Sequence, residues 1–222
     1  MNNRSKHLGI LGLGSSSTLY YINQLNKKFN DKFGGYSTAP FLMLNINFDT
    51  INPYLPEGFE ILEPIVLNSV KTLERMGCHT ILIPNITIHR TLDRLEINAL
   101  NVLHPIELTA NHLKASGIEE VVLLGSIYTM QSKYFEQLGV NIIRPSTTEM
   151  QTIDNIRKDV YQGNISKKNQ CQFQEVIGRY EQEAPIVLAC SELSMIAESC
   201  LNKNTVDMVD LQVEAALKFL EE

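Results

Sequence analysis

The sequence has 222 residues, of which 44% are hydrophobic, and this is enough to build the core of one large domain or of two small ones. Its formal net charge is −6 and its 19 Lys and Arg residues are scattered. Binding to nucleic acid or to an anionic membrane needs clustered cations, so neither partner is expected. The polar residues 1–6 and the short, glycine-containing run 8–13 resemble neither a signal peptide nor a membrane helix, and a cytoplasmic location is expected.

Short apolar runs alternate with amphipathic stretches along the chain, as in parallel strands joined by crossover helices. The expected strands are residues 8–11, 41–46, 80–83, 120–124, 141–143 and 186–189. The expected helices are residues 19–29, 63–76, 105–115, 132–138, 148–162, 168–183 and 209–220. Because the strands are almost entirely apolar, helices should cover both faces of each sheet.

This pattern runs twice. The strand exits at residues 12–18 and 83–89 in the first half correspond to the exits at residues 124–129 and 188–193 in the second half. The repeat predicts an α/β fold of two pseudo-symmetric lobes, each a parallel sheet flanked by helices. If the lobes face each other, the four exits line an active-site cleft between them.

The boundary between the lobes is expected near His104-Pro105, because a residue before proline disfavours helix and the proline can open the next one. We expect the first lobe to comprise residues 1–102 and 207–222, and the second lobe to comprise residues 103–206. The last helix, from Asp210, should pack back on the first lobe.

Hydroxyl side chains follow the expected strands in both halves: Thr87 in the first, Ser126 and Thr129 in the second. In this place hydroxyls can hold a carboxylate, although Ser and Thr also serve as helix caps. His89 is expected to be either a polar residue with its hydrogen bonds satisfied or a residue that orients neighbours, and not a metal ligand, because no second His, Asp or Glu shares its face. The segment 14–18 lacks a nucleotide-binding fingerprint.

Cys190 directly follows an apolar strand and precedes Ser191 and Glu192, which are suited to a helix start. Unpaired backbone donors at such a start favour a thiolate, although free cysteines are often small buried hydrophobes. Spacing alone leaves both interpretations open. Glu192 is either an acid of the first helical turn or an orienter of a bound amine.

The other cysteines are expected to be structural and reduced. They lack C-x-x-C spacing, so neither a disulfide framework nor a zinc site is predicted. They are Cys78, Cys171 and Cys200.

Several motifs, by their order and spacing, resemble the aspartate/glutamate racemase family, particularly its broad-specificity amino-acid racemase branch. The likeness covers nearly the whole chain. The motifs are Ser17-Thr18, Gly34-Gly35-Tyr36-Ser37-Thr38-Ala39, Leu124-Gly125-Ser126, Tyr128-Thr129-Met130, Gly163-Asn164-Ile165 and Leu188-Ala189-Cys190-Ser191-Glu192-Leu193. The resemblance implies an isomerase that needs no cofactor or pyridoxal phosphate, acts on a small amino acid or carboxylate, and forms a homodimer.

By this resemblance, Cys190 matches the second of two cysteines that exchange the α-carbon proton from opposite faces. Residues 84–89 stand where the family has Cys-Asn-Thr-x-His, so Asn85 replaces the first cysteine. An amide neither takes nor gives that proton, although some broad-specificity members carry threonine there. Gln170 stands where a Lys or Arg would neutralise a substrate carboxylate, unless Lys167 or Lys168 substitutes.

Three functions compete. The favoured one is an amino-acid racemase or related isomerase with Cys190 acting on one face, and with Thr87, Ser126, Thr129 and Ser191 holding the carboxylate. The second is a catalytically silent protein that binds an amino acid or carboxylate. The third is a decarboxylase that uses a single cysteine to protonate one face.

Overall fold

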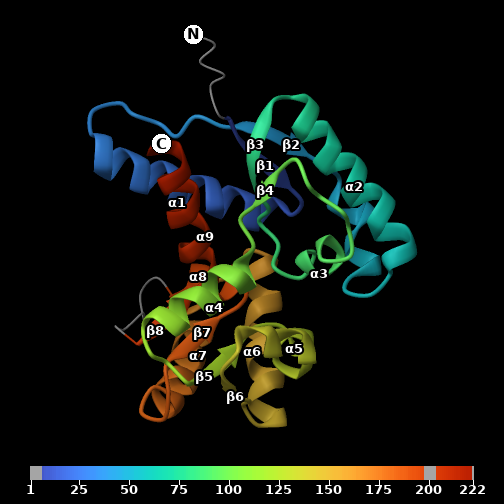
Figure 1. Ribbon diagram of the computed structural model, residues 1–222. Helices are drawn as coiled ribbons and strands as arrows, with labels where there is room; N and C mark the ends of the chain where they lie inside the picture. Colours follow the sequence, from blue (N-terminus) through green and yellow to red (C-terminus); the bar gives the residue numbers. More distant parts are fainter. Residues whose placement is uncertain (1–6, 198–203, 222) are drawn as a thin grey trace. The chain divides into compact units, whose positions relative to one another are not determined.

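The computed structural model describes residues 7–197 and 204–221. The chain divides into two compact units: unit 1 comprises residues 1–104 and 212–222, and unit 2 comprises residues 105–211. Each unit contains a four-stranded parallel sheet with helices packed against it (Figure 1). The strand orders, β2-β1-β3-β4 and β6-β5-β7-β8, are the same pattern used twice. The predicted α/β fold with two similar lobes is confirmed.

Unit 1 is wound in both directions from its first strand. Its strands are β1 (His7–Gly12), β2 (Leu42–Asn45), β3 (Cys78–Leu82) and β4 (Asn101–Val102). Its helical segments are α1 (Ser15–Phe33), the 3-10 turns η1 (Phe48–Thr50) and η2 (Asn52–Tyr54), α2 (Phe59–Arg75) and α3 (His89–Leu92). Because β2 and β3 pair with opposite edges of β1, right-handed crossovers place α1 and α2 on opposite faces of the sheet (Figure 1).

The core of unit 1 follows from the spacing of apolar residues on α2. Leu62, Val66, Val70 and Leu73 recur at three- and four-residue intervals and are all buried. They belong to one cluster with β-strand residues such as Ile81. Burial of each large apolar side chain contributes roughly 1.5–3 kcal/mol, and this fixes the helix to the sheet.

The last helix, α9 (Met208–Glu221), packs on α1 through a buried polar contact. Gln212 is fully buried, accepts a hydrogen bond from the hydroxyl of Tyr21 at 2.6 Å and donates to the carbonyl of Leu103 at 2.7 Å. Ion pairs from Lys28 to Glu214 and from Lys32 to Glu221 flank this contact. These contacts join the last helix to α1.

Unit 2 repeats the arrangement with more helices. Its strands are β5 (Glu120–Leu124), β6 (Asn141–Ile143), β7 (Ile186–Leu188) and β8 (Thr205–Asp207). Its helical segments are α4 (Pro105–Ala115), α5 (Ile127–Gln131), the 3-10 helix η3 (Lys133–Leu138), α6 (Thr147–Tyr161), α7 (Lys167–Tyr180) and α8 (Ser191–Ala197). The start of α6 is fixed by a capping box, in which Ser146 and Glu149 satisfy each other's backbone N–H groups.

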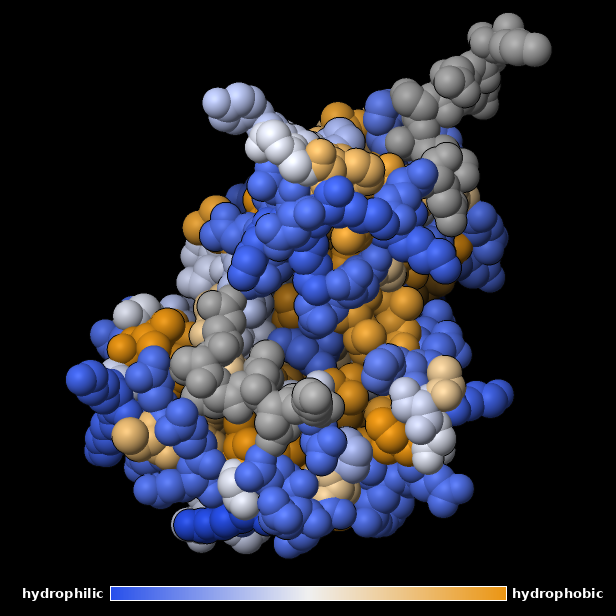
Figure 2. All heavy atoms as spheres, turned by 90° about the vertical axis from the view of Figure 1, so that its left-hand side faces the viewer, coloured by the Kyte–Doolittle hydropathy of each residue, from blue (hydrophilic) through white to orange (hydrophobic). Residues whose placement is uncertain are grey.

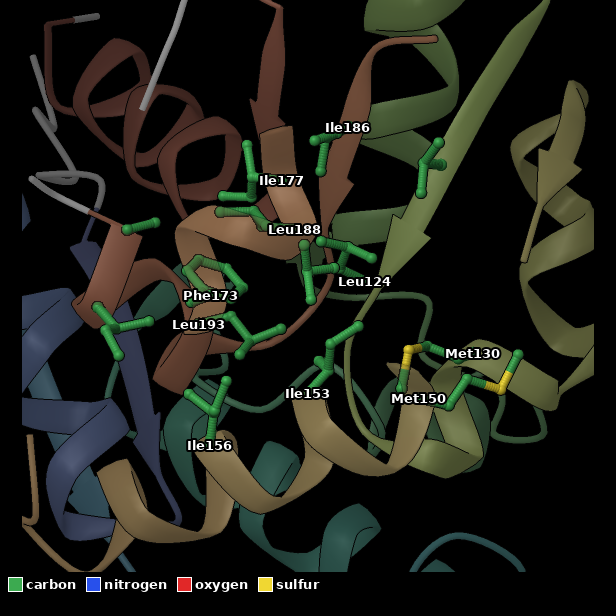
Figure 3. Packing of buried hydrophobic residues seen from close by; sticks show 14 of the residues in the cluster. Leu124, Met130, Met150, Ile153, Ile156, Phe173, Ile177, Ile186, Leu188 and Leu193 are labelled. Carbon is green, nitrogen blue, oxygen red and sulfur yellow. The ribbon is translucent and has the colours of Figure 1, made fainter. Parts of the chain in front are cut away.

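The core of unit 2 packs α6, α7 and α8 against β5 and β7. Figure 3 shows Leu124 and Leu188, from β5 and β7, among apolar residues of α6, α7 and α8. Those helix residues include Ile153, Phe173 and Leu193. This packing therefore holds α6 and α8 together beside the ends of β5 and β7.

The differences from the predicted elements concern short segments. The strands β4, with two residues, and β8, with three, were not predicted, because each contains a single apolar residue and so lacks the apolar run that marks β6 and β7. The helices α3, α5 and α8, of four, five and seven residues, are too short to show a helical repeat and were not among the expected helices, although a helix start was expected at Ser191. Residues 132–138, predicted as a helix, form a 3-10 helix that begins at Lys133.

Membrane insertion has no support in the described helices. None of them is both long enough and apolar enough to cross a bilayer. Hydrophilic side chains cover much of the face drawn in Figure 2. The predicted polar start, residues 1–6, lies outside the described residues.

Replacing Gln212 by alanine should lower the free energy of unfolding by about 2–4 kcal/mol, because it removes two hydrogen bonds in a buried environment. Urea denaturation measures this change. Glu214→Gln, on the same helix, disrupts a surface ion pair and should cost less than about 1 kcal/mol. Equal losses in the two variants would contradict the role assigned to Gln212.

Candidate functional site

In unit 2 the candidate site lies at the carboxyl ends of the neighbouring strands β5 and β7. The N–H of Ala189 donates to the carbonyl of Leu124 at 2.8 Å, which holds the two strand exits together. A Cβ atom on Gly125 would lie 2.6 Å from Cγ2 of Thr129, so a larger residue would push α5 away from the strand end. The two exits therefore bring the residues after β5 and those after β7 to one edge of the sheet.

Cys190 is half-buried and immediately precedes α8. Its thiol donates a hydrogen bond to Oε2 of Glu192 at 2.9 Å, and the hydroxyl of Ser191 donates to the same oxygen at 3.1 Å. Glu192 is itself buried, with 8% of its surface exposed. A thiol and a buried carboxylate thus form a hydrogen-bonded pair at the end of β7.

The pKa of Cys190 is raised well above its usual 9.0, chiefly by burial and then by the charge and hydrogen bond of Glu192. Arg157 and the backbone N–H of Glu192 act in the opposite direction but are outweighed. The donor at the helix start is present and favours a thiolate, but desolvation and the neighbouring Glu192 outweigh it and favour the thiol. Cys190 is a protonated thiol at neutral pH.

Helix α6 carries three charged side chains, Asp154, Arg157 and Lys158, that form ion pairs with one another. Nε of Arg157 donates to Oδ1 of Asp154 at 2.9 Å, and Lys158 lies 2.7 Å from the other carboxylate oxygen. The backbone N–H of Ile127 also donates to Asp154, at 3.4 Å. Burial lowers the pKa of Arg157, but the bond to Asp154 and the negative potential of Cys190 and Glu192 raise it overall.

Sequence reasoning missed Asp154 and Arg157, although a signal was present. Asp154 falls on the face of the helix that Met150 and Ile153 bury, and cations follow it at three and four residues. A carboxylate on an apolar face is rarely left unpaired, and this spacing brings its cations alongside it.

A second carboxyl group, that of Asp207, is linked to the Cys190 turn through Ser194. The hydroxyl of Ser194 donates to Asp207 at 2.9 Å and also lies 3.3 Å from the carbonyl oxygen of Cys190. The N–H of Val209 donates to the same oxygen of Asp207 at 2.8 Å. Burial raises the pKa of Asp207 to about 6 despite these two donors.

Ser126 and Thr129 act as helix-capping residues. The hydroxyl of Ser126 accepts from the backbone N–H of Thr129 at 3.1 Å, and the two hydroxyl oxygens are 3.0 Å apart. Thr129 has 2% of its surface exposed, whereas Ser126 is half-buried. Ser126 is therefore the member of this pair that a ligand can reach.

In unit 1 the predicted residues lie in the turn after β3. The side-chain oxygen of Asn85 accepts from the N–H of Ile88 at 3.0 Å, which folds the chain into α3. Nδ1 of His89 contacts the carbonyl oxygens of Asn85 and Ile86 at 2.9 and 3.2 Å. Since both partners are acceptors, Nδ1 carries the hydrogen. His89 was expected in a loop, but it is the first residue of α3.

His89 is a neutral residue that fixes the turn. It is fully buried, and burial together with the nearby His104 lowers its pKa to about 3. The two imidazole rings meet edge to face, with centroids 4.8 Å apart. His89 therefore holds Asn85 in place through the backbone, as an orienting residue would.

The remaining candidates are distributed over both units. Thr87 is half-buried, and its carbonyl accepts from the N–H of Arg90 at 3.3 Å. Cys78 is buried and Cys171 is exposed, while Cys200 lies outside the described residues. Within the described residues, no three His, Cys, Asp or Glu side chains form a group that could hold a metal ion.

The cations expected near Gln170 are at the surface. Gln170 is half-buried on α7, whereas Lys167 and Lys168 at the start of that helix are exposed. The family pattern places at this position a cation that neutralises a substrate carboxylate. Gln170 is uncharged and cannot fill that role.

Asp207 should make stability depend on pH. Its pKa is raised from the usual 3.8 to about 6, so its contribution to stability is complete below about pH 4 and is lost as the pH rises through 6. Asp207→Asn keeps the oxygen acceptor and removes this loss, so the variant should gain about 1–3 kcal/mol over the parent between pH 4 and pH 7. Urea unfolding at several pH values measures the gain. The exposed Asp31→Asn is the control, and a parallel pH dependence of Asp207→Asn and the parent would refute the assignment.

Comparison with known proteins shows to which family the chain belongs. A model of the family described as Asp/Glu/Hydantoin racemase matches residues 10–216. An aspartate racemase homologue from Pyrococcus horikoshii is 25% identical, with a TM-score of 0.82 over 98% of this chain and 100% of the other. An aspartate racemase from Picrophilus torridus is 25% identical, with a TM-score of 0.79 over 98% and 95% of the two chains.

A candidate Asp/Glu racemase from Yersinia pestis has the same fold, with 24% identity and a TM-score of 0.83 over 98% of this chain and 100% of the other. Together, the family model and the structural similarity support the expected function of an amino-acid racemase or isomerase. They confirm the resemblance seen in the motifs: this chain belongs to the Asp/Glu/Hydantoin racemase family.

Proposed function

We propose that this protein is a cofactor-independent isomerase that exchanges the α-carbon proton of an amino acid, with Cys190 acting on one face. The observation that carries the proposal is the hydrogen bond from the thiol of Cys190 to the buried carboxylate of Glu192, at the end of a strand where parallel α/β proteins bind ligands. Membership of a racemase family supports it.

The chemistry begins from a protonated thiol. Glu192 accepts the thiol proton along the 2.9 Å hydrogen bond, and the resulting thiolate removes the α-proton of the substrate. Cys190 is then a thiol again, and return of its proton to the same face exchanges the α-proton without inverting the carbon. After abstraction the pair holds two protons, one on each group. Once the thiol has protonated the carbanion, Glu192 passes its proton back to the thiolate, which restores the starting state without a cofactor.

Asn85 does not supply a second group that exchanges protons. The amide of Asn85 cannot exchange a proton, and its oxygen is already bonded to the N–H of Ile88. Inversion of the α-carbon therefore takes its second proton from a group other than the Asn85 side chain. Asn85 instead shapes the turn that presents Thr87.

The hydroxyls have graded roles in this proposal. Ser126 and Ser191 are half-buried and bind the substrate carboxylate, whereas Thr129 supports Ser126 from a buried position. His89 orients the turn of Asn85. We further propose that the enzyme is a cytoplasmic homodimer and uses no pyridoxal phosphate.

Cys190→Ser should lower the rate of α-proton exchange at least about 100-fold, because a serine hydroxyl is far less acidic than a thiol. Incubation with a panel of L- and D-amino acids in deuterated water, followed by proton NMR, measures the exchange. Cys171→Ser, on an exposed site, should leave it unchanged. Absence of exchange by the parent protein with every amino acid would refute the proposed function.

Glu192→Gln should separate thiol reactivity from catalysis. Removing the negative charge lowers the pKa of Cys190, so alkylation of that thiol by iodoacetamide should begin at lower pH than in the parent. Proton exchange should nevertheless fall, because the thiol has lost its proton acceptor. A pH series of alkylation, read at the Cys190 peptide by mass spectrometry, tests the shift; an unchanged or higher pKa contradicts it.

A silent binding protein is the second candidate, favoured by the engagement of Asn85 in a structural hydrogen bond. In that case an amino acid would raise the melting temperature of the parent and of Cys190→Ser equally, with no proton exchange in either. Thermal shift measurements beside the exchange assay separate the two functions.

A further inference from the structure

Arg157 is held in one orientation by the group that anchors it. Its Nε donates to Asp154, whose side chain is 5% exposed and also contacts Lys158. The N–H of Ile127, at the start of α5, binds the same carboxylate. A buried carboxylate thus joins α6 to the exit of β5 and fixes one edge of the guanidinium.

The guanidinium lies close to the catalytic pair. α6 and α8 pack together, with Ile153 and Ile156 of α6 in one cluster with Leu193 of α8 (Figure 3). Cys190 directly precedes α8. The charge of Arg157 lowers the pKa of Cys190, and the charges of Cys190 and Glu192 raise that of Arg157, so the three groups lie within electrostatic reach of one another.

Arg157 has donors to spare. A guanidinium carries five N–H groups in a planar fork, and within the described part of the chain Nε alone makes a hydrogen bond, to Asp154. The side chain keeps 22% of its surface exposed. The two terminal nitrogens therefore remain able to bind a planar anion side-on.

The charges around Cys190 make such a cation necessary. Glu192 is buried beside the thiol and repels any anion that approaches. Lys158 is bound to Asp154 and more than half exposed, and Lys167 and Lys168 lie exposed at the start of α7. A carboxylate ligand can approach Cys190 without a net repulsion if it is bound by Arg157.

We infer that Arg157, positioned by Asp154, binds the carboxylate of the ligand beside Cys190, and that it supplies the charge which the sequence lacks at Gln170. The inference deepens the proposed function and rests on it. It restricts the ligand to molecules with a carboxylate that can reach Arg157 while another carbon meets the thiol. Amino-acid amides and esters should be poor ligands.

Two alkylating reagents test this without any turnover. Iodoacetate and iodoacetamide attack the same thiolate, but iodoacetate alone carries a carboxylate, so the ratio of their rates at Cys190 reports attraction of an anion and cancels changes in thiol pKa. The ratio at the exposed Cys171 of the same molecule gives the reference. Rates are read peptide by peptide with mass spectrometry.

Arg157→Gln should lower the normalised ratio at least about threefold at low ionic strength. Lys158→Gln is the matched control, because it removes a cation from the same Asp154 and should leave the ratio unchanged. Arg157→Lys keeps the charge and should stay nearer the parent. The double variant Asp154→Asn/Arg157→Gln leaves no buried carboxylate unpaired, so it gives the same readout if the single variant misfolds.

Equal ratios in the parent, Arg157→Gln and the double variant would overturn the inference, whether or not the parent exchanges α-protons. A fall in both Arg157→Gln and Lys158→Gln would assign the effect to general surface charge and would also overturn it. A lowered ratio with no proton exchange by the parent would uphold the anion site and reject the isomerase.

Discussion

Parallel pairing brings the carboxyl ends of neighbouring strands to the same edge of a sheet, and each group of candidate residues in this protein depends on that constraint. In unit 2 it sets the Cys190 turn beside the Ser126 turn, joined by the backbone bond between Ala189 and Leu124. In unit 1 it sets the Asn85 turn beside the exit of β1. The helices then differ in what they bring to the edge: α6 supplies a buried ion pair, whereas α3 supplies a neutral histidine.

The thiol and its surroundings illustrate a balance between desolvation and charge. Burial and Glu192 keep the proton on Cys190, while Arg157 and a helix N–H favour its release. The Cys190–Glu192 pair is therefore poised by opposing effects, and a bound anion or the exclusion of water would alter each of them. The reactivity of Cys190 therefore depends on Glu192, Arg157 and the helix start together. The helix start by itself would favour a thiolate.

Sequence periodicity was sufficient for the long elements, because their apolar positions repeat over several turns, as in α2 and α6. It also located the turn of Cys190, since that residue directly follows an apolar strand. It did not find β8, which contains Asp207, and the ion pair of Arg157 with Asp154 was overlooked although its three-residue spacing lies within one helix. The residues of β8 include a single apolar side chain and so form no apolar run, and the burial that raises the pKa of Asp207 arises only when the chain folds.

The division of the chain has a consequence for its synthesis. Unit 1 is formed by two separate segments of the chain, residues 1–104 and residues from Gln212 onward. Residues 105–211, which form unit 2, are synthesised between them. Tyr21 and Gln212, which meet in the core, are 191 residues apart. On the ribosome, unit 2 can therefore complete its sheet before the first unit closes, so the part of the protein made first is finished last.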